Sequence, residues 1–108
     1  MDKFLVRGSG PLNGELHVGG AKNSALKLMA ASLLAEGSTR LVNVPDITDV
    51  AIMTELLEAM GVEIQRTGHS VDINVPDEID PIAPYSLVER MRASIVVLGP
   101  LLARIGRA

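Results

Sequence analysis

The stretch Gly19-Gly-Ala-Lys-Asn-Ser-Ala-Leu-Lys-Leu-Met-Ala-Ala-Ser-Leu-Leu-Ala-Glu-Gly37 decides the fold of this chain. Its two opening glycines allow a sharp turn or a close approach of the backbone, and the Ala, Leu and Met residues that follow favour a helix. Between Asn23 and Ala35 the only charged residue is Lys27, so we expect a helix that is buried on most sides. Gly37 stands where a glycine cap would end this helix.

Lys22 is an unexpected residue at the start of this helix. The helix macrodipole is already positive there, so an ammonium group is unfavourable by propensity alone. A bound anion would reverse this, because the free N–H groups, the dipole and Lys22 could together hold one phosphate. The ordinary alternative is a solvated lysine beside a loop, and this stretch by itself favours that alternative.

Composition limits the class of protein. The 108 residues suffice for one domain with an aliphatic core, since the chain has one Phe, one Tyr and no Trp. Cysteine is absent, and neither His17 nor His69 has a partner at metal-ligand spacing, so we expect no disulfide and no metal site. A net charge of −3 with interspersed signs provides no basic stripe for nucleic acid. No apolar run is long enough to cross a bilayer, and no secretory signal is visible, so we expect a soluble cytoplasmic protein.

Before the central stretch, apolar and polar residues alternate on both sides of a glycine-rich segment. This pattern, with Asn13-Gly14 as the turn, predicts a short antiparallel pair of strands. The apolar positions are Phe4, Val6, Leu16 and Val18.

After the central stretch, residues 39–44 predict a strand with Leu41 and Val44 directed inward. An amphipathic helix follows, capped by Thr48 or Asp46 and ended by Gly61. We expect one apolar face of this helix to be buried and two glutamates, Glu55 and Glu58, to be exposed. The apolar positions are Ile52, Met53, Leu56, Leu57 and Met60.

The remaining chain predicts a hairpin, a loop and a second apolar helix. Residues 62–66 and 70–75 alternate strictly around a Thr-Gly-His turn, and residues 76–84 are rich in proline and acids. Ser86 and Glu89 match a capping box. We expect a short turn from Ser86, a main helix from near Met91, and a bend near Gly99-Pro100.

The second apolar helix resembles the first. When Asn23 is aligned with Arg92, 69 positions later, Leu33 meets Leu102 and Gly37 meets Gly106. This predicts a repeated unit, whose equivalent helix starts would converge if the units pack side by side. Lys22, Asn23 and Arg92 would then form an anion pocket, although Arg92 could instead be a solvated arginine. No acid–base dyad, activated nucleophile or phosphate-binding glycine loop is present.

Several motifs in the order of the chain resemble the UDP-N-acetylglucosamine 1-carboxyvinyltransferase family of enolpyruvyl transferases, and the resemblance covers the whole chain. They are Gly20-Ala-Lys-Asn23, Leu41-Val-Asn-Val-Pro45, Leu56 to Val62, Ala83-Pro-Tyr85, Met91-Arg-Ala-Ser-Ile95 and Leu98-Gly-Pro100. The sister family, 5-enolpyruvylshikimate-3-phosphate synthase, has a similar topology but typically opens with Gly-Ser-Lys-Ser.

The resemblance implies transfer of enolpyruvyl from phosphoenolpyruvate to the 3-hydroxyl of UDP-N-acetylglucosamine, with release of phosphate and without a metal or organic cofactor. This is the first committed step of peptidoglycan synthesis. In the family, the residues matching Lys22 and Asn23 line the phosphoenolpyruvate pocket, and the arginine matching Arg92 helps to bind the nucleotide sugar. Both substrates are anionic, and the two cations would offset the cost of desolvating them.

The implied fold is α/β (α+β): an inverse αβ-barrel-type lobe built of repeated βαβαββ units. Residues 1–20 would be strands of the other, C-terminal-half lobe, and residues 21–108 the first repeat and the opening helix of the second. The proton donor would lie beyond Ala108. We therefore expect an N-terminal fragment that is inactive alone and self-associates through an uncovered apolar face.

Two other functions stay open. One is a 5-enolpyruvylshikimate-3-phosphate synthase-type transferase. The other is a non-catalytic small α/β module that binds an anion or a partner through the face that further repeats would cover.

Overall fold

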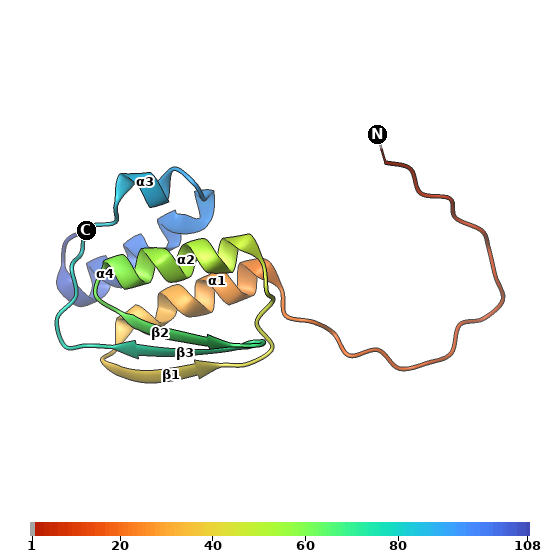
Figure 1. The fold of residues 1–108 in the computed structure, drawn as a ribbon, viewed down its shortest axis with the longest axis horizontal. Coiled ribbons are helices and arrows are strands. Elements are labelled where there is room, and N and C mark those ends of the chain that lie inside the picture. Colours follow the sequence, from red (N-terminus) through yellow and green to blue (C-terminus); the bar gives the residue numbers. More distant parts are fainter. Residues whose placement is uncertain (1) are drawn as a thin grey trace.

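A computed structural model describes residues 2–108 and shows a three-stranded antiparallel sheet with helices on one face (Figure 1). The strands are β1 (Gly37–Leu41), β2 (Glu63–Thr67) and β3 (Ser70–Val75), in the order β1-β3-β2. Both pairings are antiparallel, and Ile73 of β3 lies between Thr39 and Ile64. The predicted hairpin is confirmed, as β2 and β3.

The helical layer contains two long spans and the helix between them. The first span is α1 (Lys22–Ala31) with the 3-10 helix η1 (Ser32–Leu34), and the second is the 3-10 helix η2 (Arg92–Val97) with α4 (Leu98–Ile105). Helix α2 (Thr48–Ala59) packs on α1, and the short α3 (Tyr85–Val88) lies over α2 (Figure 1). Within residues 2–108 each helix is too short or too polar to traverse a bilayer.

The two long spans run parallel to each other. Helix η2 packs against α1, and α4 packs against η1, so the start of one span lies beside the start of the other. Gly37 and Gly106, which follow the two spans, both have positive φ angles, of 119° and 87°. These common features agree with the predicted equivalence of the two helices.

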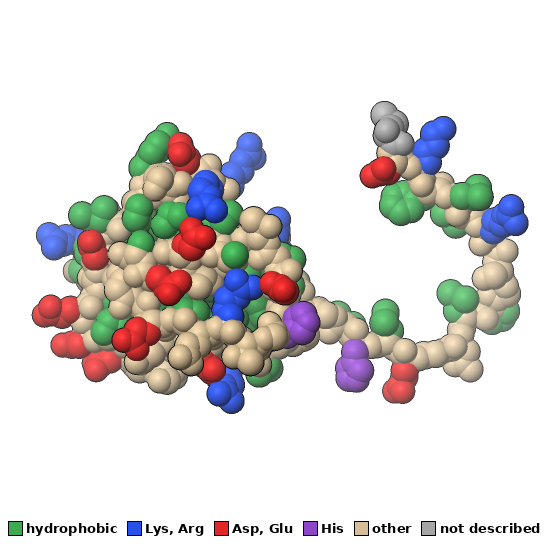
Figure 2. All heavy atoms as spheres, viewed as in Figure 1, with side chains coloured by type: hydrophobic (Ala, Val, Ile, Leu, Met, Phe, Trp, Pro, Cys, Tyr) green, Lys and Arg blue, Asp and Glu red, His purple; other side chains and the backbone are tan. Residues whose placement is uncertain are grey.

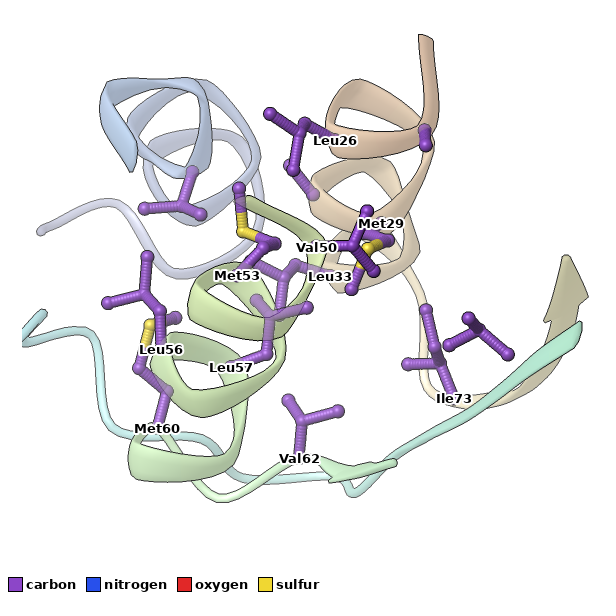
Figure 3. Packing of buried hydrophobic residues seen from close by; sticks show 14 of the residues in the cluster. Leu26, Met29, Leu33, Val50, Met53, Leu56, Leu57, Met60, Val62 and Ile73 are labelled. Atoms are coloured by element: carbon purple, nitrogen blue, oxygen red, sulfur yellow. The ribbon is translucent and has the colours of Figure 1, made fainter. Parts of the chain in front are cut away.

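The core is aliphatic and lies between α1, α2 and the sheet (Figure 3). The predicted buried face of α2 is confirmed, and Glu55 and Glu58 are exposed as expected. Methionine supplies flexible filling where no aromatic ring is available. The largest side chains with almost no exposure include Leu26, Met29 and Leu33 from the first span and Met53, Leu56, Leu57 and Met60 from α2 or its end.

The predicted cap of α2 is wrong. Ile47 is the N-cap residue and makes no side-chain capping bond. Thr48 is already the first helical residue, and the Asp46 carboxylate accepts a hydrogen bond from Arg66 instead (2.9 Å). The predicted end at Gly61 is confirmed, because its φ of 100° favours glycine.

Burial of the first helix on most sides is also a wrong prediction. One face, with Leu26 and Met29, is buried, but Lys27 is exposed, and Leu28 and Leu34 are 51% and 52% exposed. Within residues 2–108 nothing covers this second face. Gly37 is not the cap of α1 either, because the helix ends through η1 and Gly37 opens β1.

The predicted antiparallel pair at the N-terminal end is wrong for this structure. Residues 2–21 contain no strand and form an extended arm that leaves the body of the molecule (Figure 2). Phe4 is 96% exposed. The physical reason is that an isolated two-stranded hairpin is at best marginally stable in water, and no other strand here supports it.

The second helical span begins near Met91 as predicted, but its details differ. Helix α3 has Pro84 as its N-cap residue and no side-chain cap, so the capping box of Ser86 and Glu89 does not form. Pro100 lies in the first turn of α4, where the N–H group that proline lacks would have no partner within the helix, so it does not interrupt α4. The bend near Gly99-Pro100 stays a prediction. The loop at 76–84 is confirmed.

Arg104 joins the second helical span to the rest of the body. Its guanidinium donates to the backbone oxygens of Leu33 (3.1 Å), Pro76 (3.1 Å) and Asp77 (3.0 Å). We expect Arg104→Ala to lower the free energy of unfolding by about 1–2 kcal/mol, because three carbonyl groups lose a charged donor. Urea unfolding followed by far-UV circular dichroism measures this. Arg107→Ala removes an exposed arginine three residues later, and an equal loss in that variant would contradict the expectation.

Candidate anion-binding site

The candidate site lies at the end of the helical layer where α1, α2 and η2 begin. Helices α1 and α2 both start at the end of the body from which the N-terminal arm leaves (Figure 1). The start of η2 lies beside α1 because the two spans are parallel. None of the three starts has a side-chain cap, so their first N–H groups are available to an anion or to water.

Lys22 is the first residue of α1, and its counter-ion is Asp49 in the first turn of α2. Lys22 Nζ lies 3.3 Å from Asp49 Oδ2, and the two side chains are 54% and 31% exposed. The unfavourable charge at the helix start is therefore balanced by a neighbouring helix. Asp49 could not be predicted as a site residue, because the two first turns are 27 positions apart in sequence and come together only through packing.

Asn23 and Arg92 are exposed at neighbouring helix starts. Within residues 2–108 no hydrogen bond or ion pair joins Lys22, Asn23 and Arg92 to one another. The fold brings the helix starts that carry them to one end of the layer, and it leaves the side chains of Asn23 and Arg92 open to solvent. Their roles as substrate-binding residues stay predictions.

Gly20 fixes the start of α1 against the segment after β1. A Cβ atom built on Gly20 would overlap the backbone oxygen of Asn43 and lie 3.1 Å from Pro45 Cδ. Asn43 itself has a φ of 56°, which is uncommon for a residue other than glycine. Its side-chain Nδ2 donates to the carbonyl of Val18 (3.2 Å), so Asn43 holds the chain on the approach to Gly20 as well.

A second set of contacts joins the segment after β1 to the turn between β2 and β3. The N–H of Val44 donates to the carbonyl of His69 (2.8 Å), and the Nδ1–H of His69 donates to the carbonyl of Val44 (2.9 Å). The ion pair between Arg66 and Asp46 lies beside these bonds (2.9 Å). These contacts account for the position of His69.

Two surface hollows are alternative places for a ligand. A groove of about 380 Å³ runs between the start of α1 and β1, lined by Ser24, Leu28, Leu41 and Asn43 among others. A wider hollow of about 990 Å³ lies along the sheet and includes Arg40 and Asp72, but none of Lys22, Asn23 and Arg92. We place the candidate site at the helix starts, because uncapped N–H groups lie there and two of the three starts begin with a cation, Lys22 or Arg92.

The sheet hollow has its own charge pair. Arg40 Nε donates to Asp72 Oδ1 (2.7 Å), and this hydrogen bond together with the charge of Asp72 raises the pKa of Arg40. The guanidinium is exposed and charged in any case. Glu58 and Glu63 also line this hollow, so its lining carries more acidic than basic side chains, which disfavours an anionic ligand. Among residues 2–108, no three His, Asp or Glu side chains are grouped as metal ligands.

Comparison with known proteins adds to this geometry. The family model described as EPSP synthase (3-phosphoshikimate 1-carboxyvinyltransferase) matches residues 6–108. The UDP-N-acetylglucosamine 1-carboxyvinyltransferase of Cellvibrio japonicus is 54% identical over an alignment of 109 positions, which covers 100% of this chain and 26% of that protein. The enzyme of the same name from Corynebacterium efficiens is 53% identical over 107 residues, covering 99% of this chain and 25% of its own length. This chain therefore spans about a quarter of these relatives.

A solved structure has the same fold. The enolpyruvyl transferase NikO from Streptomyces tendae superposes with a TM-score of 0.75 at 28% identity, over 88% of this chain and 22% of its own. The predicted α/β (α+β) fold of an enolpyruvyl transferase lobe and the resemblance to UDP-N-acetylglucosamine 1-carboxyvinyltransferases are confirmed. With the family match extending over residues 6–108, the chain belongs to the EPSP synthase (3-phosphoshikimate 1-carboxyvinyltransferase) family.

Proposed function

We propose that the longest product of this gene transfers enolpyruvyl from phosphoenolpyruvate to the 3-hydroxyl of UDP-N-acetylglucosamine. The carbon–oxygen bond to phosphate breaks, a bond from the sugar oxygen to the same carbon forms, and the hydroxyl proton leaves with the phosphate. The observation that carries this proposal is the identity of 46–54% to proteins named for this reaction, over essentially the whole chain. The motif Gly20-Ala-Lys-Asn23 at the uncapped start of α1 supports it.

The site residues have different proposed roles. The ammonium of Lys22 and the amide of Asn23 contact phosphoenolpyruvate, and the guanidinium of Arg92 contacts the nucleotide sugar. Phosphate and carboxylate groups are bound well by such charged and amide donors beside free backbone N–H groups. This arrangement uses the helix starts of both parallel spans, so each span contributes to one substrate.

The proton donor and the remaining substrate contacts are proposed to lie beyond Ala108. Neither Ser24 nor Ser94 has a neighbouring base, and Ser94 Oγ donates to the carbonyl of Val88 (3.3 Å). We accordingly expect no turnover from residues 1–108 alone, because half of a site cannot position both reactants and move a proton. Residues 1–20 are proposed to belong to a second lobe, where other strands would pair with them.

The activity has a cellular setting. Both substrates would be met in the cytoplasm, and the product would feed peptidoglycan synthesis. Cell-wall biogenesis, cell shape and cell division would then depend on this protein. No cofactor is proposed, because replacing one carbon–oxygen bond by another requires no oxidant or reductant.

Phosphate release from phosphoenolpyruvate by the longest natural product of the gene tests the proposal. UDP-N-acetylglucosamine and shikimate 3-phosphate are offered as acceptors in separate reactions. Release that depends on the sugar nucleotide supports the proposal. Release only with shikimate 3-phosphate would favour the sister activity, for which the description of the matching family model is the supporting observation. Release with neither acceptor would leave a non-catalytic anion- or partner-binding module as the better account.

Self-association is proposed for the 108-residue chain when it is studied alone. Several large apolar side chains are exposed on its helical layer, and such patches favour association in water. They include Leu28, Leu34, Ile95 and Leu102. We expect size-exclusion chromatography with light scattering to give an average mass that rises with protein concentration above that of the 11.4 kDa monomer. A monomer mass that stays constant up to millimolar concentration would contradict this.

A further inference from the structure

The ion pair between Lys22 and Asp49 differs from the other ion pairs of residues 2–108. Three pairs use arginine, and they join Arg40 to Asp72, Arg66 to Asp46 and Arg90 to Glu55. The fourth uses lysine and connects the first turns of two adjacent helices. A lysine ammonium is a point charge on a flexible stem, so it can exchange one anionic partner for another more easily than a bidentate arginine.

Asp49 competes with an incoming anion for the ammonium group of Lys22. An anion that contacts Lys22 Nζ must approach a group that already lies 3.3 Å from a carboxylate oxygen. Two unit negative charges beside one ammonium repel each other. In water, at a separation of about 4 Å, this repulsion lowers the affinity for the incoming anion by a factor of about five. Asp49 therefore opposes anion binding for as long as it stays in place.

Asp49 can leave Lys22 without becoming an unstabilised charge. Its side chain is 31% exposed, so water can reach the carboxylate. It also lies in the first turn of α2, where the helix dipole favours a negative charge and where no side-chain cap competes for the free N–H groups. Ion pairs that water reaches contribute little to stability, so the exchange of this half-exposed pair costs little free energy.

We propose that Asp49 is the resident counter-ion of Lys22 and that an incoming phosphate or phosphoenolpyruvate displaces it. This inference rests on the proposed function only in taking Lys22 as the anion-contacting group. Because Asp49 remains in the neighbouring first turn of α2, it repels a multiply charged phosphate more strongly than it repels chloride. Asp49 thus weakens the retention of the released phosphate.

Anion titrations of the 108-residue chain, followed by ¹H–¹⁵N NMR at the backbone amides of Lys22 and Asn23, test this inference. Inorganic phosphate and phosphoenolpyruvate are the probes, with chloride at matched ionic strength as the reference. We expect Asp49→Asn to bind both probes roughly three- to tenfold more tightly than the wild type at low salt, with a smaller gain at high salt. Asp49→Ser is a second variant, in case the asparagine variant does not fold.

Two matched variants identify the source of the effect. Asp46→Asn removes the same charge from the same segment, but its carboxylate is paired with Arg66, so we expect a change below twofold. In a Lys22→Gln background, Asp49→Asn should also change affinity by less than twofold, because the group for which Asp49 competes is absent. A gain of equal size in either of these variants would indicate only a general charge effect and would overturn the inference.

Three further results would overturn the inference. One is equal or weaker binding by Asp49→Asn, which would make Asp49 a positioning residue that holds Lys22 in place. Another is a gain of the same size for chloride. The third is the absence of any anion-dependent shift at Lys22 and Asn23 in all variants. Because these titrations contain no acceptor and measure no turnover, their outcome is separate from the transfer assay that tests the proposed function.

Discussion

Lys22→Ala in the longest natural product of the gene is expected to lower kcat/KM for phosphoenolpyruvate roughly 10²- to 10³-fold, as is typical when one charged or hydrogen-bonding contact to a reacting group is removed. Lys22 lies at the uncapped start of α1, where an ammonium is favourable only if it has an anionic partner. With alanine there, the free N–H groups remain but the cation is lost. Steady-state phosphate release at varied phosphoenolpyruvate concentration measures the effect.

Lys27→Ala is the matched control for this prediction. Lys27 is exposed on the same helix, in the turn after Lys22, and its removal changes the net charge equally. We expect a change below twofold in kcat/KM for Lys27→Ala. If both variants lose the same activity, the effect comes from net charge or helix stability, and Lys22 is not a contact of the substrate.

Gly20→Ala is expected to lower the free energy of unfolding by about 2–3 kcal/mol, as overpacking against rigid neighbours does. The added Cβ would overlap the backbone oxygen of Asn43, which cannot rotate away as a flexible side chain could. The conflict can be relieved only by moving the start of α1 or the segment after β1. Thermal unfolding followed by far-UV circular dichroism should show a melting temperature lower by roughly 10 °C.

Gly19→Ala separates this clash from the general effect of replacing a glycine. A Cβ on Gly19 would meet nothing within 4 Å. The variant should unfold within about 0.5 kcal/mol of the wild type. Equal stability of Gly19→Ala and Gly20→Ala would mean that the arm moves to absorb the added atom, and that the contact with Asn43 does not determine where α1 begins.

The parts of the fold that could be predicted are those whose pattern is local. The hairpin of β2 and β3 follows from strict alternation around a short turn, and the buried face of α2 follows from helical spacing. The exposed face of α1 could not be predicted, because an apolar helix has the same sequence whether one side or several sides are covered. The predicted strand pair before Lys22 was wrong for a related reason. Alternation of apolar and polar residues marks a segment that can form a strand, but a strand also needs a neighbouring strand to pair with.

The candidate site was predicted in part. The charge of Lys22 at a helix start is a local signal, and the repeat spacing relates Arg92 to the same kind of position. Asp49 has no such signal, since it becomes the partner of Lys22 only when α2 packs beside α1. The contact of Gly20 with Asn43 likewise joins segments that are distant in sequence. For Gly20, the sequence indicated only that another part of the backbone could approach it closely.

The aliphatic core has a consequence for how the folding of this protein can be observed. The two aromatic side chains both lie outside the core, with Phe4 96% and Tyr85 77% exposed, so near-ultraviolet absorption and intrinsic fluorescence report on the surface alone. The interior instead contains Met29, Met53, Met60 and Met91, all of them buried. Their methyl groups, distributed over α1, the α2 region and the start of η2, would give four separate NMR signals for the cooperativity of the core.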